Sequence, residues 1–281
     1  MNFPAALIFS DLDGSLLDHV SYSWDEAKNS IDLCRRYRIP IVLVSSKTRN
    51  EMEIIRRDIG LSAPFISENG GGIFFPDMKI QPIPQTAVFT DGLWKYTLGV
   101  PHETVLKALR EIREELGMGI HGFSDMTPDE IGALTGLDPG KAKIAADREF
   151  DEPFIILDDD PDLDQLHNSA GKRGLKITEG GRFYHLHGKY DKGDAVNYLI
   201  LQYRSIFPDI FTIALGDSPN DFSMFKKVEQ PVLIRSSRGF PEIEKVMPGI
   251  KVTAYPGPKG WNSAVLEILN ERIEGGIANH V

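Results

Sequence analysis

The chain has 281 residues, of which 41% are hydrophobic and 26% are charged, the profile of a globular protein with one large domain or two smaller ones. Its net charge of -10, from 31 Lys+Arg against 41 Asp+Glu, argues against nucleic acid or an anionic membrane as the main partner. The one cysteine excludes an internal disulfide, and no apolar run approaches the roughly 20 residues that span a bilayer. We therefore expect a soluble, cytoplasmic protein, whose charge still allows a local basic pocket for a phosphorylated small molecule.

A buried strand opens the chain and ends in two carboxylates. Residues 5–9 are uninterruptedly apolar, as in a parallel strand that is buried on both faces, and Asp11, Asp13 and Gly14 follow. Both aspartates would project from the carboxyl edge of the sheet, where open α/β sheets bind ligands. Crowded carboxylates repel each other unless a cation lies between them, which predicts a hard divalent ion, Mg2+. Asp11 could still attack a phosphoryl group. The alternative is a polar turn after the strand.

Helices and strands alternate over the next stretch. Residues 27–38 fit a helix, residues 41–44 a buried strand, and a further helix ends at Ile59, before Gly60. A short strand follows at 64–66. Each expected strand is followed by polar residues, Ser45 to Thr48 in one case and residues 67–72 in the other. This order favours an α/β fold with a doubly wound parallel sheet.

The pattern changes near Pro82 and returns near Gly188. In between we expect a long helix after Pro101 that ends at Gly117, a helix start at Thr127, and strands at 154–157 and 182–187. The segment is large enough to form a domain of its own. The sequence thus predicts a catalytic core from residues 1–82 and 189–281, with an inserted α/β cap domain at 83–188.

More polar side chains follow in the last third. Lys192 opens an expected helix, and the buried strand 211–215 ends in a run that contains Asp217 and Asp221. These carboxylates could complete an oxygen-rich cation site with Asp11, while Ser45 and Ser46 could hold phosphoryl oxygens. Lys192 adds a positive charge at a helix N-terminus, which favours an anion. Each residue taken singly fits a cap, a turn or a solvated surface better than a role in catalysis, and only their joint arrival at strand ends favours a site.

The motifs together resemble those of a known family. Asp11-Leu12-Asp13-Gly14-Ser15-Leu16, then Ser45, Lys192 and the run 216–221, are similar to the four motifs of the haloacid dehalogenase-like phosphohydrolases, in the same order. The large insertion between the second and third motifs is typical of members with a big α/β cap. Within that family, residues 126–131, 135–137, 148–154 and 180–185 resemble the mannosyl-3-phosphoglycerate phosphatases. The resemblance covers nearly the whole chain.

The resemblance implies a role for each matching residue. Asp11 matches the nucleophile that becomes an aspartyl phosphate, and Asp13 matches the general acid and base. Ser45 matches the hydroxyl of the second motif, although serine stands where threonine is common and Ser46 is adjacent. Lys192 matches the cation that stabilises the phosphoryl oxygens. The implied cofactor is Mg2+, held by a set that comprises Asp11, Asp13 through its backbone carbonyl, Asp217 and Asp221, with Asn220 in support.

The cap is expected to determine specificity. A glycosyl phosphoglycerate carries a phosphate and a carboxylate, for which Arg148, Arg182 and Lys47 are the expected partners, with Asn69, Gly70 and Asn220 in the same cleft. For Arg148, a salt bridge to Glu149 or Glu179 is the alternative. His185 and His187 would face one side of a strand. With no cysteine nearby, we favour satisfied or substrate-facing histidines over a zinc pair.

The resemblance thus implies a Mg2+-dependent phosphatase that converts mannosyl-3-phosphoglycerate to mannosylglycerate and phosphate. One alternative is a phosphatase of another sugar phosphate, such as glucosyl-3-phosphoglycerate. Another is a phospho-accepting signalling domain, which also combines acidic residues, a Ser or Thr, a lysine and a phosphorylatable Asp. That alternative leaves unexplained why Asp13 follows Asp11 by two residues and why a domain is inserted.

Overall fold

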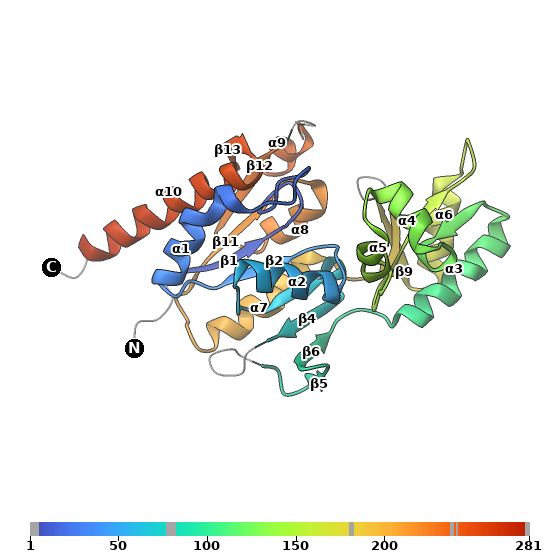
Figure 1. The fold of residues 1–281 in the computed structure, drawn as a ribbon, viewed down its shortest axis with the longest axis horizontal. Coiled ribbons are helices and arrows are strands. Elements are labelled where there is room, and N and C mark those ends of the chain that lie inside the picture. Colours follow the sequence, from blue (N-terminus) through green and yellow to red (C-terminus); the bar gives the residue numbers. More distant parts are fainter. Residues whose placement is uncertain (1–5, 77–82, 180–182, 237–238, 240, 279–281) are drawn as a thin grey trace.

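A computed structural model of the chain describes residues 6–76, 83–179, 183–236, 239 and 241–278. Among them, the strands form one nine-stranded and one four-stranded sheet (Figure 1). The larger sheet has the order β13-β12-β11-β1-β2-β3-β4-β6-β5. Its parallel part comprises β13 (Lys251–Pro256), β12 (Gln230–Arg235), β11 (Phe211–Gly216), β1 (Ala6–Ser10), β2 (Ile41–Val44) and β3 (Phe65–Ser67). Its antiparallel edge comprises β4 (Gly72–Phe75), β6 (Leu93–Thr97) and β5 (Val88–Thr90).

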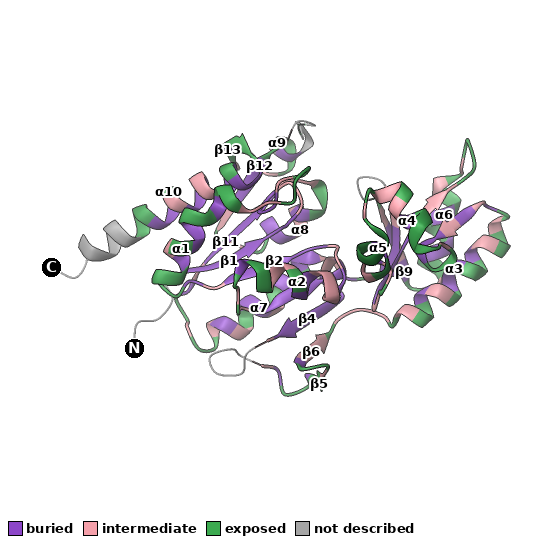
Figure 2. Ribbon diagram, in the orientation of Figure 1, coloured by how far each residue is buried: buried purple, intermediate pink, exposed green. Residues whose placement is uncertain are grey.

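Helices cover both faces of the large sheet. Alternate residues of β1 belong to different cores, because Ala6 and Ile8 pack with one set of helices and Leu7 and Phe9 with the other. The first set is α1 (Lys28–Arg36), α2 (Arg49–Ile59) and α10 (Gly257–Ala278). The second set is α7 (Lys192–Arg204), α8 (Phe222–Phe225) and α9 (Pro241–Val246). In Figure 2 the central strands β1, β2 and β11 of this sheet are purple, and exposed residues lie on the outer helices. The predicted doubly wound core is confirmed.

The inserted domain has its own sheet and core. Its strands have the order β7 (Ile120–Gly122), β8 (Asp151–Ile156), β10 (Tyr184–Gly188) and β9 (Leu175–Glu179), and every pair is antiparallel. Helices α3 (His102–Leu116) and α6 (Leu163–Lys172) bury Ile112 and Leu166 against this sheet. Helices α4 (Pro128–Thr135) and α5 (Pro139–Ala145) share a smaller cluster. The predicted inserted α/β domain is confirmed, and Thr127 is the N-cap of α4, as its sequence indicated.

The junction between the domains differs from the expected boundary at residue 83. Strands β5 and β6 fall within the range 83–188, yet they pair with β4 at the edge of the nine-stranded sheet. Leu93 and Trp94 pack against opposite cores of that sheet, as successive residues of a strand do. We therefore propose that the inserted domain, called the cap below, spans residues 98–188. The remaining residues form the core.

Phe150 packs into the junction between the cap and the core. The side chain is 3% exposed and lies against three glycines, so that a Cβ atom added at Gly71, Gly72 or Gly99 would lie within 2.7 Å of it. Gly71 also accepts hydrogen bonds from the backbone N–H groups of Leu98 and Gly99, at 3.0 and 2.8 Å. The glycines therefore form a socket that admits the phenylalanine only because they have no side chains.

We expect Gly71→Ala to lower the free energy of unfolding by about 1–3 kcal/mol, the usual cost of overpacking a core. Its added Cβ would lie 2.5 Å from the Cβ of Phe150, which the backbone on both sides holds in place. The measurement is urea denaturation. The matched control is Gly171→Ala in α6, where an added Cβ meets nothing within 4 Å, so that stability is retained or rises by up to about 1 kcal/mol. Equal stability of the two variants would contradict the claim that Phe150 fits only because these residues are glycines.

Candidate active site

Three carboxylates and a lysine meet at the carboxyl edge of the large sheet. Asp11 follows β1, while Asp217 and Asp221 follow the adjacent parallel strand β11. One oxygen atom from each of the three aspartates lies within 4.8 Å of the others. Lys192 is the first residue of α7, and its Nζ is 2.7 Å from Oδ1 of Asp11 and 2.7 Å from Oδ1 of Asp221. Residues separated by up to 210 positions are thus brought to one point, as the parallel order of the strands predicts.

Lys192 is fixed and charged at this point. Its side chain is 1% exposed. Burial by itself lowers the pKa of Lys192, but the carboxylates of Asp11 and Asp221 raise it above its ordinary value. The second oxygen of Asp221 accepts hydrogen bonds from the backbone N–H groups of Asp217 and Ser218, both at 3.1 Å. Asp221 therefore holds both the lysine and the loop that carries Asp217.

The carboxylates form a site that fits a hard cation. Burial raises the pKa of Asp11 well above its usual range, with Asp221 and Asp217 adding to the rise and Lys192 opposing it. Burial also raises the pKa of Asp217 to about 7, and Asp221 adds to this rise. A divalent ion with oxygen ligands offsets both effects, because it favours the ionised carboxylates. Gly14 makes room for this arrangement, since a Cβ there would lie 2.6 Å from Oδ2 of Asp217.

Asp13 is held apart from the three clustered carboxylates. Its Oδ2 is 2.7 Å from Nζ of Lys47, and its Oδ1 is buried and has no hydrogen-bond partner among the described residues. Lys47 also lies over the ring of Tyr22, 5.5 Å from its centroid. Lys47, which we expected to contact substrate, lines the cavity described below and also contacts Asp13. The carboxylate is therefore oriented through one oxygen, while the other has no partner within the described part of the chain.

The remaining predicted core residues lie around this cluster. Ser45 is 1% exposed, and its Oγ accepts a hydrogen bond from the backbone N–H of Lys47 at 3.2 Å, whereas Ser46 lines the cavity described below. The side chains of Asn69 and Asn220 are in contact, at 3.5 Å. Gly70 has φ +110°, and a Cβ there would lie 2.3 Å from the carbonyl oxygen of Asp191, the N-cap of α7. Gly70 therefore has a structural effect, because it lets α7 and Lys192 approach.

A cavity of about 320 Å³ extends from the aspartates to the cap. That volume falls within the ~300–1,000 Å³ of ordinary small-molecule sites. Its core side includes Asp11, Asp13, Ser46 and Asp217. Its cap side includes Thr135, Leu137, Pro153 and Phe183, which lie in the stretches that carried the family resemblance, and also Phe123 and Thr178, which the sequence analysis did not single out. Their apolar or small side chains look the same in the sequence as those of a domain core, so nothing in the sequence assigned them individually to the cavity.

Arg148 joins cap and core. Its side chain is 7% exposed and also lines the cavity. Its Nη1 donates to the carbonyl oxygen of Ser46 at 2.6 Å and lies 3.1 Å from Oδ1 of Asp151. The expected alternatives, Glu149 and Glu179, are not its partners among the described contacts. Arg182, the other arginine expected to bind substrate, lies outside the described residues.

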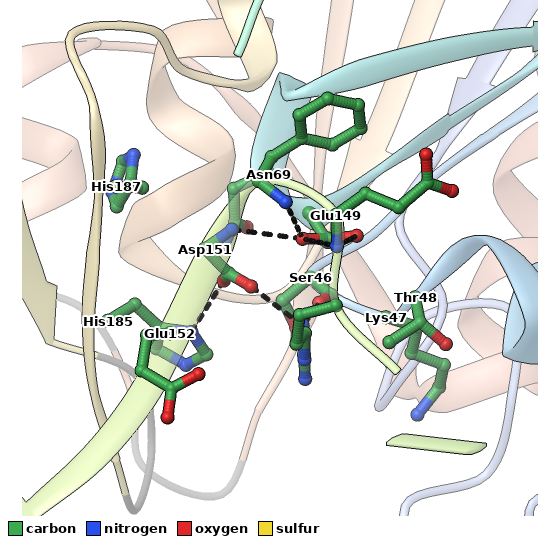
Figure 3. A network of polar contacts seen from close by, with 12 residues as sticks. Ser46, Lys47, Thr48, Asn69, Glu149, Asp151, Glu152, His185 and His187 are labelled. Carbon is green, nitrogen blue, oxygen red and sulfur yellow. Dashed lines mark hydrogen bonds and ion pairs between the residues drawn. The ribbon is translucent and has the colours of Figure 1, made fainter. Parts of the chain in front are cut away.

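Glu68 strengthens the same junction. This buried residue has φ +48°, and its carboxylate accepts hydrogen bonds from the backbone N–H groups of residues 149–151, at 2.7 to 3.1 Å. Figure 3 shows this network of contacts, with Asp151 close to His185. The carboxylate of Glu68, in the core, thus binds the backbone at the start of cap strand β8. Sequence reasoning missed this contact because the partners of Glu68 lie 81 to 83 positions away.

Comparison with known proteins identifies the family. A model of the haloacid dehalogenase-like hydrolases matches residues 8–92. The chain is also 40% identical over 280 residues to the glucosyl-3-phosphoglycerate/mannosyl-3-phosphoglycerate phosphatase of Persephonella marina, an alignment that covers 96% of this chain and 99% of that protein. The chain belongs to the haloacid dehalogenase-like hydrolases. This haloacid dehalogenase-like hydrolase is 38% identical over 266 residues to the phosphatase of the same name from Methanococcoides burtonii, with 94% of this chain and 97% of that protein covered.

The fold agrees with this membership. The sucrose-phosphatase of Synechocystis sp. has a TM-score of 0.58 at 13% identity, and the match covers 94% of this haloacid dehalogenase-like hydrolase and 98% of that chain. The phosphohydrolase family predicted from the sequence motifs is confirmed. In the part of the chain that the structure describes, no helix is both long and apolar enough to cross a bilayer.

Proposed function

We propose that the protein is a Mg2+-dependent phosphatase that hydrolyses mannosyl-3-phosphoglycerate to mannosylglycerate and phosphate and accepts glucosyl-3-phosphoglycerate in the same site. The observation that carries this proposal is the 40% identity, over nearly the full length of both chains, to a phosphatase named for both compounds. The clustered aspartates and Lys192 supply the chemistry such a reaction needs. The cytoplasmic location and the absence of nucleic acid and membrane partners stay predictions.

The reaction follows from the positions of the side chains. Lys192 contacts Oδ1 of Asp11, which leaves Oδ2 to attack phosphorus. As the aspartyl phosphate forms, the bond between phosphorus and the glycerate oxygen breaks, and Asp13 gives that oxygen a proton from Oδ1. Asp13 then takes a proton from the water that attacks phosphorus, and the carboxylate of Asp11 is released with inorganic phosphate. Positioned proton transfer of this kind contributes typically 10²–10⁴-fold.

Asp11, Asp217 and the backbone of Asp13 would hold the Mg2+, with Asp221 in support. When bound, Mg2+ neutralises charge on the transferred phosphoryl group. Lys192 contributes a second, permanent positive charge on the side of Asp11 and Asp221. Glu68 and Arg148 hold the cap against the core, and Arg148 also lines the cavity, so the cap limits the access of bulk water to the site.

Release of phosphate from a panel of phosphate esters tests the proposal. We expect both glycosyl-3-phosphoglycerates to be hydrolysed over many turnovers, with kcat/KM at least about tenfold above those of simple sugar phosphates, because only the former fill the cap side of the cavity. A higher kcat/KM for a simple sugar phosphate would contradict the proposal that glycosyl-3-phosphoglycerates are the substrates. A phospho-accepting signalling domain would instead take up about one equivalent of phosphoryl group and stop.

Removal of Mg2+ provides a separate test. We expect excess chelator to stop phosphate release and added Mg2+ to restore it. We also expect Mg2+ to raise the Tm, because a cation that binds only the folded protein stabilises it, by about 2.7 kcal/mol at 100 times its Kd. The control is Asp217→Asn, whose Tm should respond much less. Full activity in excess chelator would refute the cation site.

A further inference from the structure

His185 is a cap residue in contact with the cavity. It belongs to β10 of the four-stranded sheet, and its side chain is 11% exposed. It lines the same cavity as Asp11 and Asp13. Because the groups that transfer phosphate lie in the core, a molecule with its phosphate at Asp11 can reach His185 only with its other end.

Asp151 fixes the ring of His185. Nδ1 of His185 is 2.9 Å from Oδ2 of Asp151, and the other oxygen of Asp151 is 3.1 Å from Nη1 of Arg148. Burial alone would raise the pKa of Asp151, but Arg148 and His185 lower it below its usual range, so the carboxylate is ionised. An ionised carboxylate only accepts hydrogen bonds, and the proton therefore lies on Nδ1. In the neutral ring, Nε2 is then an acceptor, and it makes no hydrogen bond within the described residues.

His187, two residues further along β10, shows the contrast. Its Nε2 lies 3.0 Å from Oγ1 of Thr178, and its side chain is almost wholly buried. Burial lowers the pKa of His187 to about 4, so this ring is neutral, and its Nδ1 is buried without a hydrogen-bond partner among the described residues. Of the two histidines on this face, only His185 lines the cavity that holds the aspartates and combines this position with a fixed tautomer.

We infer that His185 is a substrate-binding residue, whose Nε2 accepts a hydrogen bond from a hydroxyl group of the glycosylglycerate that leaves, and that Asp151 positions its ring for this contact. The inference rests on the proposed function and adds the residue that recognises the leaving group. A sugar or glycerate hydroxyl is the donor that this acceptor requires. A phosphate ester without such hydroxyls gains nothing from His185.

Two substitutions distinguish the contribution of Nδ1 of His185 from that of Nε2. The amide nitrogen of Asn lies near the position of Nδ1, so His185→Asn keeps the hydrogen bond to Asp151 and removes the acceptor in the cavity. The longer side chain of Gln brings an amide oxygen near the position of Nε2, so His185→Gln retains an acceptor there. At about pH 8, where a free imidazole is neutral, we expect His185→Asn to raise the KM for mannosyl-3-phosphoglycerate about tenfold, the effect of one hydrogen bond. We expect His185→Gln to raise it less than about threefold.

The same variants are assayed with p-nitrophenyl phosphate, which has no sugar and no glycerate. We expect its kcat/KM to be unchanged in both, and His167→Asn, an exposed histidine of α6, to leave both substrates unaffected. An equal loss with both substrates, or an equal loss in both His185 variants, would overturn the inference. If the wild-type protein hydrolyses neither glycosyl-3-phosphoglycerate, the proposed function fails instead. The comparison is then made with whichever sugar phosphate it does hydrolyse.

Discussion

Asp11→Asn is expected to lower kcat for phosphate release by at least about 10⁴-fold, the scale on which removal of a nucleophile acts. The amide of Asn cannot form the aspartyl phosphate. The variant should nevertheless fold as well as the wild-type protein. Burial and two neighbouring carboxylates raise the pKa of Asp11, so the loss of its charge relieves repulsion, while Lys192 keeps Asp221 as a partner. We expect the Tm to stay the same or to rise.

Asp18→Asn is the matched control for this variant. Asp18 lies in the same loop but outside the aspartate cluster, and its Oδ1 accepts hydrogen bonds from Ser21 and from the backbone N–H of Val20, which an amide oxygen can also accept. Both kcat and Tm should be unchanged. Phosphate release by Asp11→Asn within tenfold of the wild-type rate would exclude Asp11 as the nucleophile.

Lys192→Met should cost both activity and stability. The substitution leaves the buried carboxylates of Asp11 and Asp221 without their cation, and loss of one partner from a buried ion pair costs about 3–5 kcal/mol. The transferred phosphoryl group also loses a positive charge. We therefore expect the free energy of unfolding in urea to fall by that amount and phosphate release to be lost. This result differs from that of Asp11→Asn, in which stability is retained.

Two further variants make this test specific to the cluster. Lys189→Met removes an exposed lysine three residues earlier, and its stability should change by no more than about 0.5 kcal/mol. Adding Asp221→Asn to Lys192→Met removes one unpaired charge and should recover part of the lost stability, because the stability changes caused by substitutions at residues in contact do not simply add. An unfolding free energy that is unchanged in Lys192→Met would show that the lysine does not balance these carboxylates.

The arrangement of the core could be predicted because its signals are local. Residues 5–9 are apolar at every position and residues 211–215 at every position but Thr212, which identifies central parallel strands, and the observed strands end within one residue of the expected ends. Parallel order then places Asp11 and Asp217 at the same edge of the sheet. The signal for the helix start at Thr127 was equally local, since the Ncap and N3 residues of a capping box are three positions apart.

The contacts that could not be predicted depend on the packing of distant segments. Strand β5 exposes Val88 and Phe89, so it lacks the pattern of a buried strand and is assigned only by pairing with β6. The sequence supplies Lys47 and Arg148 as cations but does not show that Asp13 and Asp151 are their partners. Long charged side chains can reach several neighbours, and the fold decides among them.

The most direct test of the account is to find where the phosphoryl group is held during turnover. Asp13→Asn should accumulate the intermediate from p-nitrophenyl phosphate, because nitrophenolate leaves without a proton whereas the variant cannot take the proton of the attacking water. After acid quenching with 32P-labelled p-nitrophenyl phosphate, we expect up to one label per chain, released by hydroxylamine as acyl phosphates are, on the peptide that contains Asp11. Label on any other residue, or none at all while labelled phosphate is still released, would contradict the central claim that Asp11 is the nucleophile of this site.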